Sequence, residues 1–176
     1  PGRVHLLGTD EMGHDIFSMV LSGFRYTLLF SLTAALGSVS LGTVLAFASL
    51  YFPRIGRGIN HLATVFLIIP DILLILFVAA FAAPTCTNTI LSMIFFSWPR
   101  VFRIARSRLS ACFSSNKVAY TMLIGGNMWD VIRKLWHDVY PVIGTLFMMQ
   151  ASRAVTYETT LAFFGLGDPL LKTWGR

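Results

Sequence analysis

The chain has 176 residues, of which 55% are apolar and 12% are charged, and its mean hydropathy is +0.69. A soluble domain uses about a quarter of its residues as charges to cover its surface, so this composition excludes an ordinary soluble protein and favours a membrane protein. Its formal charge is +6, from 14 Lys and Arg against 8 Asp and Glu. In a membrane protein the position of such an excess along the chain indicates topology and not nucleic-acid binding.

Residues 1–25 precede the first long apolar run and combine Asp10, Glu11 and Asp15 with several glycines. This stretch does not have the basic start and apolar core of a signal peptide. Because it is slightly acidic apart from Arg3 and Arg25, we expect it to lie on the external side of a membrane.

Apolar runs then predict four membrane spans, at residues 26–52, 59–83, 84–101 and 139–167. A span needs about 20 apolar residues to cross ~30 Å of hydrocarbon. The first run has no charged residue, the second has only Asp71, and the fourth carries Arg153 and Glu158. The sequence therefore predicts an all-α, polytopic transmembrane helical bundle.

Basic residues close to the span ends predict the orientation. Residues 53–58 contain Arg54 and Arg57, and residues 103–138 contain six Lys and Arg, so both segments are expected to be cytoplasmic. Residues 84–89 are uncharged and are expected to be external. Much of the +6 charge thus reflects topology.

The segment 103–138 is long for a connection inside a compact bundle, which is typical of a functional element. Its second half contains Trp129, Ile132, Trp136 and Val139 on one face of a predicted amphipathic helix. Asn127 followed by Asp130 is typical of a helix cap, and Gly125–Gly126 predicts a break before it. This helix-turn-helix either lies on the lipid surface or docks on a cytoplasmic partner, and the pattern alone does not separate the two.

Asp71 lies beside Pro70 in the middle of the second predicted span. A carboxylate at this depth costs about 2.5–3.5 kcal/mol on insertion scales, so it is expected to face the bundle interior or a water-filled path. Asp71 either lines a translocation pathway or has a structural role such as pairing with Arg153. Arg153 and Glu158 are five residues apart, about 140° around a helix, so they are not expected to bridge each other.

Ala34, Ser38 and Gly42 recur every four residues in the first span and allow close helix packing. Packing within the subunit is the simpler interpretation, and contact with another membrane subunit is the alternative. Tyr26, Trp98 and Trp174 at predicted span ends are interpreted as interface anchors. Cys86 and Cys112 fit neither a disulfide framework nor metal-ligand spacing, so their redox state stays open.

Three stretches resemble one permease family: HLLGTDEMGHDIFS at residues 5–18, GFRYTL at 23–28 and LAFFGLG at 161–167, the last followed by Trp174 and Gly175. The family is the C-type permease subunit of dipeptide/oligopeptide/nickel ABC importers, whose opening pattern is H-P-L-G-T-D-x-x-G-R-D-V-x-S-R. His14 and Met19 stand where this pattern has arginine. The family's cytoplasmic E-A-A-x-x-x-G signature is matched only by Ala119, Tyr120 and Thr121 ahead of Gly125, without the acidic residue.

The resemblance implies about four spans of a six-span permease, which pairs with a homologous permease in a bacterial or archaeal inner membrane. It also implies two cytoplasmic ABC ATPases that hold ATP and magnesium, and an extracytoplasmic substrate-binding protein. No G-x-x-x-x-G-K-[ST] phosphate loop is present in this chain, so we expect neither catalysis nor a cofactor or metal in it. ATPase coupling is expected from Ala119, Tyr120, Thr121, Leu123, Gly125, Gly126, Trp129 and Arg133.

The translocation pathway is expected to include Asp71, Arg153 and Glu158, the last at a family position. Short peptides are the expected cargo, and nickel or a metal chelate is the alternative. A four-span ion channel and an intramembrane enzyme built on Asp71 and Glu158 are remote alternatives.

Overall fold

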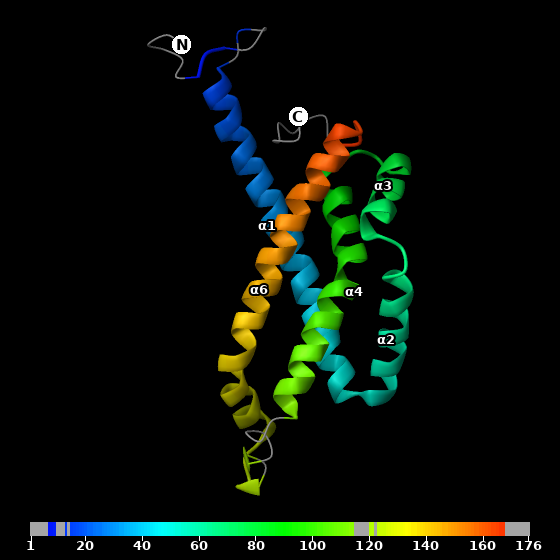
Figure 1. Cartoon of the computed structure of the whole chain (residues 1–176), viewed down its shortest axis with the longest axis vertical. Helices are drawn as coiled ribbons and strands as arrows, with labels where there is room; N and C mark the ends of the chain where they lie inside the picture. Colours follow the sequence, from blue (N-terminus) through cyan, green and yellow to red (C-terminus); the bar gives the residue numbers. More distant parts are fainter. Residues whose placement is uncertain (1–6, 10–12, 14, 115–119, 122, 168–176) are drawn as a thin grey trace.

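The computed structural model describes residues 7–9, 13, 15–114, 120–121 and 123–167. Its helices form an elongated bundle (Figure 1). They are α1 (Ile16–Tyr51), α2 (Pro53–Phe66), α3 (Asp71–Phe81), α4 (Cys86–Phe113) and α6 (Met128–Phe163). An all-helical fold is therefore confirmed for the described part of the chain.

Helix α1 begins ten residues before the predicted span. Asp15 caps it, because its carboxylate accepts hydrogen bonds from the backbone N–H of Ser18 at 3.2 Å and from the Ser18 hydroxyl at 2.6 Å. The helix ends at Tyr51 because Pro53 disfavours helical geometry at Phe52, and Pro53 then occupies the first turn of α2. The predicted loop at 53–58 is accordingly the start of α2.

The predicted span 59–83 is not one helix. Helices α2 and α3 meet at an angle of 76° across residues 67–70. Pro70 provides no backbone N–H donor and disfavours helical geometry at Ile69, so the chain cannot continue the α2 hydrogen-bond pattern. Asp71 consequently lies in the first turn of a new helix and not in the middle of a straight span.

Two other predicted boundaries differ from the structure. Helix α4 runs through Pro99 to Phe113, well beyond residue 101, and α6 begins at Met128 and runs through Pro141. The amphipathic run after Gly126 is therefore the first part of α6 and not a separate short helix. Both helices are long enough to absorb a proline with the loss of one backbone hydrogen bond.

The four predicted spans are not all supported by helix length and composition. Within the described residues, α1 is long and apolar enough to cross a membrane, and α2 with α3 qualifies as a broken pair. Helix α4 carries four arginines from Arg100 onward, which lower its hydropathy. The four-span arrangement stays a prediction.

The connections between helices fall at two opposite ends of the bundle, and which side of a membrane each end faces stays a prediction. The turn between α1 and α2 lies at the same end of the bundle as the C-terminal end of α4, and we call this the α1–α2 end (Figure 1). The connection from α3 to α4 and the start of α1 lie at the opposite end, the α3–α4 end. The basic segments expected in the cytoplasm thus share one end.

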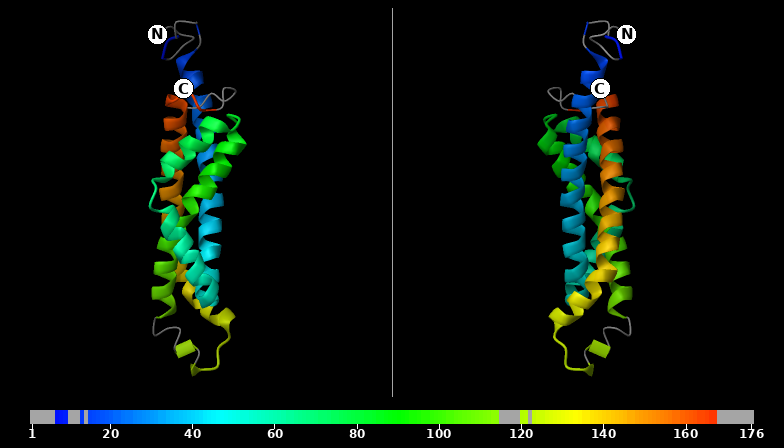
Figure 2. Two further views of the ribbon diagram at one scale, coloured as in Figure 1. Left: turned by 90° about the vertical axis from the view of Figure 1, so that its right-hand side faces the viewer. Right: turned by 90° about the vertical axis from the view of Figure 1, so that its left-hand side faces the viewer.

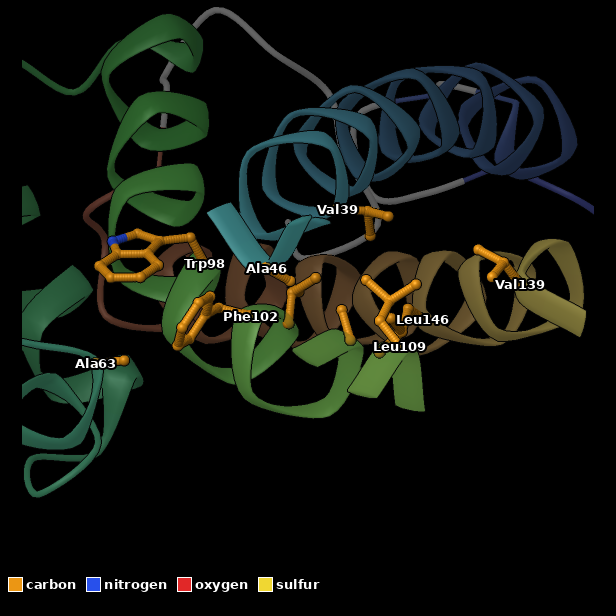
Figure 3. Packing of buried hydrophobic residues seen from close by; sticks show 10 residues of the cluster. Val39, Ala46, Ala63, Trp98, Phe102, Leu109, Val139 and Leu146 are labelled. Carbon is orange, nitrogen blue, oxygen red and sulfur yellow. The ribbon is translucent and has the colours of Figure 1, made fainter. Parts of the chain in front are cut away.

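Buried apolar side chains form two clusters at different heights of the bundle. Figure 3 shows the cluster nearer the α1–α2 end, in which Trp98 and Phe102 of α4 pack with Val39 and Ala46 of α1 and with Leu146 of α6. The other cluster contains Phe30, Ile75, Met93, Ala154 and Leu161 among its members. Between them α1, α4 and α6 each place one buried polar residue, namely Ser38, Ser97 and Gln150.

Trp98 is part of the core and not an interface anchor. It is 5% exposed, and its ring lies 6.0 Å from that of Phe102 and 6.1 Å from that of Phe66, measured between centroids. The prediction was wrong because α4 extends beyond Trp98, so this residue is not at a helix end. Tyr26 is exposed within α1, and Trp174 lies outside the described residues.

The small-residue stripe of α1 is buried within this chain. Ala34 and Ser38 are 2% exposed, and a Cβ atom on Gly42 would lie 2.6 Å from the Cβ of Val101 in α4. These contacts support the interpretation that the stripe packs helices within the subunit.

Replacing Gly42 with valine is therefore expected to destabilise the fold by about 1–3 kcal/mol, the usual cost of overpacking. The reason is that a Cβ atom there would also lie 3.0 Å from the backbone nitrogen of Phe102, which cannot rotate away. Gly144→Val is the matched control, because no atom lies within 4 Å of a Cβ at that helical glycine. Thermal unfolding of the purified protein in detergent measures both. Equal midpoints for the two variants would contradict the packing.

Candidate functional site

Asp71 is the buried centre of a partly exposed ion cluster. It is 8% exposed, and one carboxylate oxygen, Oδ1, lies 3.3 Å from Nη2 of Arg100. The other oxygen, Oδ2, lies 3.6 Å from Nη1 of Arg153. Since the break before α3 places Asp71 in the first turn of that helix, one carboxylate joins α3 to both α4 and α6.

Tyr157 adds a hydroxyl to this cluster. Nη1 of Arg153 donates a hydrogen bond of 3.3 Å to the Tyr157 hydroxyl, and the two residues are one turn apart on α6. The same hydroxyl interacts with the Asp71 carboxylate. The cluster of Asp71, Arg100, Arg153 and Tyr157 thus has two formal positive charges and one negative charge.

A second polar group lies beside the cluster. Nε2 of Gln150 donates to Oγ of Ser38 at 3.4 Å, and Ser38 donates to the carbonyl of Ala34 at 2.8 Å. A small cavity of about 10 Å³ is lined by Ser38, Ser97, Gln150, Arg153 and Tyr157 together with apolar neighbours. Such a volume holds about one water molecule. We call this layer, together with the ion cluster, the polar belt.

The structure brings two of the three predicted pathway residues together. Asp71 and Arg153 form the ion pair that was considered as the structural alternative. Glu158 is buried at 8% exposure, five residues further along α6. A role of these residues in a pathway stays a prediction.

Sequence reasoning missed Arg100, Gln150 and Tyr157. Gln150 and Tyr157 carry no charge and gave no signal inside an apolar run. Arg100 did have one, because Arg100, Arg103 and Arg106 recur every three residues and therefore lie near one face of α4. Arg103 and Arg106 were interpreted only as topology signals, and Arg100, inside the predicted span 84–101, was not interpreted at all.

The predicted coupling segment forms an exposed apolar turn. Tyr120, Leu123 and Ile124 are exposed, and Leu123 is 84% exposed. In Figure 2 this turn projects beyond the ends of α1, α2 and α4. Ala119 lies outside the described residues.

Two glycines shape this turn for different reasons. Gly125 has φ +77°, a conformation that glycine adopts easily and other residues avoid. Gly126 donates its N–H to the carbonyl of Thr121 at 2.9 Å, and a Cβ atom on it would lie 2.7 Å from Cγ2 of Thr121. Thr121 is buried under the turn, which leaves the apolar side chains outside.

Helix α6 begins immediately after the turn. The backbone N–H of Asn127 donates to the Asp130 carboxylate at 3.0 Å, so the predicted cap is confirmed. Trp129 is 74% exposed, and Arg133 and Trp136 are also exposed. Val139 is buried in the core, so only the first turns of the amphipathic run present apolar surface.

The chain is similar to known permeases over nearly its whole length. The chain is 29% identical to a peptide transport system permease protein of Brucella suis over 171 residues, which are 96% of this chain. It is 28% identical to the glutathione transport system permease protein GsiD of Pectobacterium atrosepticum over 178 residues. The resemblance to the dipeptide/oligopeptide ABC permease family is confirmed. No protein-family model matches the chain.

The chain is shorter than the relatives that it resembles. The chain spans 57% of the Brucella relative and 59% of the Pectobacterium relative. Among the described residues, no group of three or more His, Cys, Asp or Glu side chains could hold a metal ion. The residues that the structure gathers are instead arginines, hydroxyls and an amide around one carboxylate.

Proposed function

We propose that this chain is a membrane permease subunit of an ATP-driven ABC importer and forms part of a translocation pathway for short peptides. The observation that carries the proposal is the similarity to peptide and glutathione permeases over 96–99% of the chain. The chain transports and does not catalyse. Two cytoplasmic ABC ATPases bind ATP and magnesium, and a second, homologous permease completes the bundle in the inner membrane.

The polar belt supports a pathway in the proposed subunit. Charged side chains at membrane depth are costly unless they face the bundle interior or water. A broken helix pair with charges at the break is also a common arrangement at transporter binding sites. Asp71, Arg153 and Glu158 are assigned to this pathway, and Arg100 joins them through its ion pair with Asp71.

The exposed turn supports docking on the ATPases. Apolar side chains at a projecting tip, with Arg133 nearby, fit a groove with a polar rim in a partner protein. The lipid surface is the alternative ligand for this turn. In the proposed mechanism, a loaded binding protein docks at the α3–α4 end, ATP closes the ATPases, and the turn transmits that closure to the helices.

Uptake tests the function directly. A strain that lacks the transporter is complemented with the complete operon, and uptake of labelled short peptides and of nickel is measured with and without cellular ATP. ATP-dependent peptide uptake is expected, and the binding protein that co-purifies should bind peptides. Nickel uptake alone would replace the peptide assignment with the metal alternative, and ATP-independent flux of ions would favour a channel.

A further inference from the structure

Three arginines of α4 form a ladder that faces α2 and α3. Nη2 of Arg100 contacts Asp71 at 3.3 Å, Nη2 of Arg103 contacts the Thr64 hydroxyl at 3.5 Å, and Nη1 of Arg106 contacts the Asn60 carbonyl oxygen at 3.4 Å. Along α4 the residue numbers of the arginines rise from 100 to 106, while those of their partners on α3 and α2 fall from 71 to 60, so the two sides run antiparallel. The ladder thus extends from the polar belt toward the α1–α2 end.

The ladder has far more positive than negative charge. Helices α2, α3 and α4 together contain six arginines and one acidic residue, Asp71. Arg103 and Arg106 are paired with neutral oxygens at long distances. The buried Nε atoms of Arg100 and Arg106 have no hydrogen-bond partner among the described residues. These Nε atoms are too buried to reach an anion in water, but a guanidinium has five donors, so its single contact with the neutral Thr64 hydroxyl leaves the exposed Arg103 with donors for an anion.

The surroundings of the ladder indicate water. Placing a guanidinium group against hydrocarbon costs roughly 2.5–3.5 kcal/mol on insertion scales, so these arginines are expected to face water. Arg103 is exposed and Arg106 is half-buried, and both contact polar side chains of α2. The side of α2 that they contact contains Asn60 and Thr64, both polar, while Val65 and Leu62 are exposed elsewhere on that helix.

We propose that Arg100, Arg103 and Arg106 line a water-filled, electropositive exit lane that takes the carboxylate groups of the cargo. The proposal rests on the function proposed above and specifies the cargo as carboxylate-bearing. Arginine suits this role because its planar guanidinium binds a carboxylate through two parallel hydrogen bonds. The same charge repels a free divalent cation, so it disfavours nickel as the cargo.

Reactivity of introduced thiols tests the lane without using transport. Thr64→Cys is made in a chain with Cys86→Ser and Cys112→Ser, in the assembled transporter. A methanethiosulfonate with a sulfonate group is then compared with one carrying a trimethylammonium group. We expect the anionic reagent to react about tenfold faster. A cleft lined by charges of one sign raises the association rate of ions of the opposite sign by roughly 10–10³. Arg103→Gln with Arg106→Gln should bring the two rates close together.

Leu62→Cys is the control for this experiment, because Leu62 is exposed on α2 away from the ladder. It should show no preference for the anionic reagent. A Thr64→Cys thiol that reacts with neither reagent, or with both equally, would overturn the lane, because the surface beside the ladder would then be covered or electrically neutral.

Uptake separates failure of the lane from failure of the proposed function. Peptides with a free C-terminal carboxylate and their C-terminally amidated forms are compared in the wild type and in the Arg103→Gln, Arg106→Gln double variant. The ratio of their uptake should fall about tenfold in the double variant, whereas Arg108→Gln, a change of an exposed arginine on the same helix, should leave it unchanged. Normal uptake with an unaltered ratio overturns the lane alone. Absence of ATP-dependent peptide uptake in the wild type overturns the function, while the thiol rates remain interpretable.

Discussion

Replacing Asp71 with alanine is expected to destabilise the subunit by about 2–3 kcal/mol. Removing one partner of a fully buried ion pair costs about 3–5 kcal/mol because an uncompensated charge remains. Here two arginines would lose their shared carboxylate, but each is about one-third exposed, which lowers the estimate. The midpoint of thermal unfolding of the purified transporter measures the loss.

A compensating variant shows whether the ion pairs cause this loss. Asp71→Ala combined with Arg153→Met removes both members of one pair, so the double variant should be more stable than the sum of the single changes predicts. Strictly additive effects would mean that the two side chains do not interact in the protein. Asp15→Ala, which removes a helix cap far from the ion cluster in the sequence, provides the control and should cost about 1 kcal/mol.

Asp71→Asn distinguishes the structural role from the pathway role. Asparagine keeps the size of the side chain and removes its charge. If Asp71 lines the pathway, uptake rate or selectivity should change in variants that assemble normally. Normal uptake of every peptide tested would restrict Asp71 to a structural role.

Replacing Leu123 and Gly125 with aspartate is expected to reduce uptake at least tenfold while the subunit still assembles. Leu123 is 84% exposed, so it has almost no packing to lose in this chain, and an effect of the Leu123→Asp change alone on transport comes from contacts outside this chain. Gly125 has φ +77°, so a side chain there also strains the turn by about 1–2 kcal/mol. ATP hydrolysis and uptake are measured together in proteoliposomes, where hydrolysis should no longer drive uptake.

Two controls accompany this experiment. Ser114→Asp places the same charge at an exposed position at the same end of the bundle and should leave uptake unchanged. Gly58→Ala is the control for losing a glycine, because a Cβ atom at this position in α2 would have open space around it, and it should also leave uptake unchanged. Wild-type coupling in the Leu123→Asp, Gly125→Asp variant would contradict docking through the turn and favour the lipid surface as its ligand.

Sequence patterns predicted the elements whose cause is local. The Asn127–Asp130 cap and the break at Gly125 follow from neighbouring side chains and from φ +77° at one glycine, and both are present. The helix starts and ends were less accurate. Pro70 interrupts a span, whereas Pro99 and Pro141 lie inside helices, and only packing against other helices decides between these outcomes.

The ion cluster could be predicted only in part. Asp71 was identified because a charge in an apolar run is costly, and Arg153 was named as a partner for the same reason. Arg100 and Tyr157 come from helices whose register relative to Asp71 depends on the 76° bend between α2 and α3. No local pattern in the sequence determines that angle.

The polar belt also has a mechanical consequence. The two apolar clusters on either side of it are close-packed and resist deformation, because any shift would open voids between their side chains. In the polar belt, by contrast, the hydrogen bonds are long, at 3.3–3.4 Å, and a water-sized cavity lies beside them. Its polar side chains can therefore exchange hydrogen-bond partners without opening a void. The polar belt is therefore the level of the bundle at which side chains exchange partners most easily when the exposed turn is pushed.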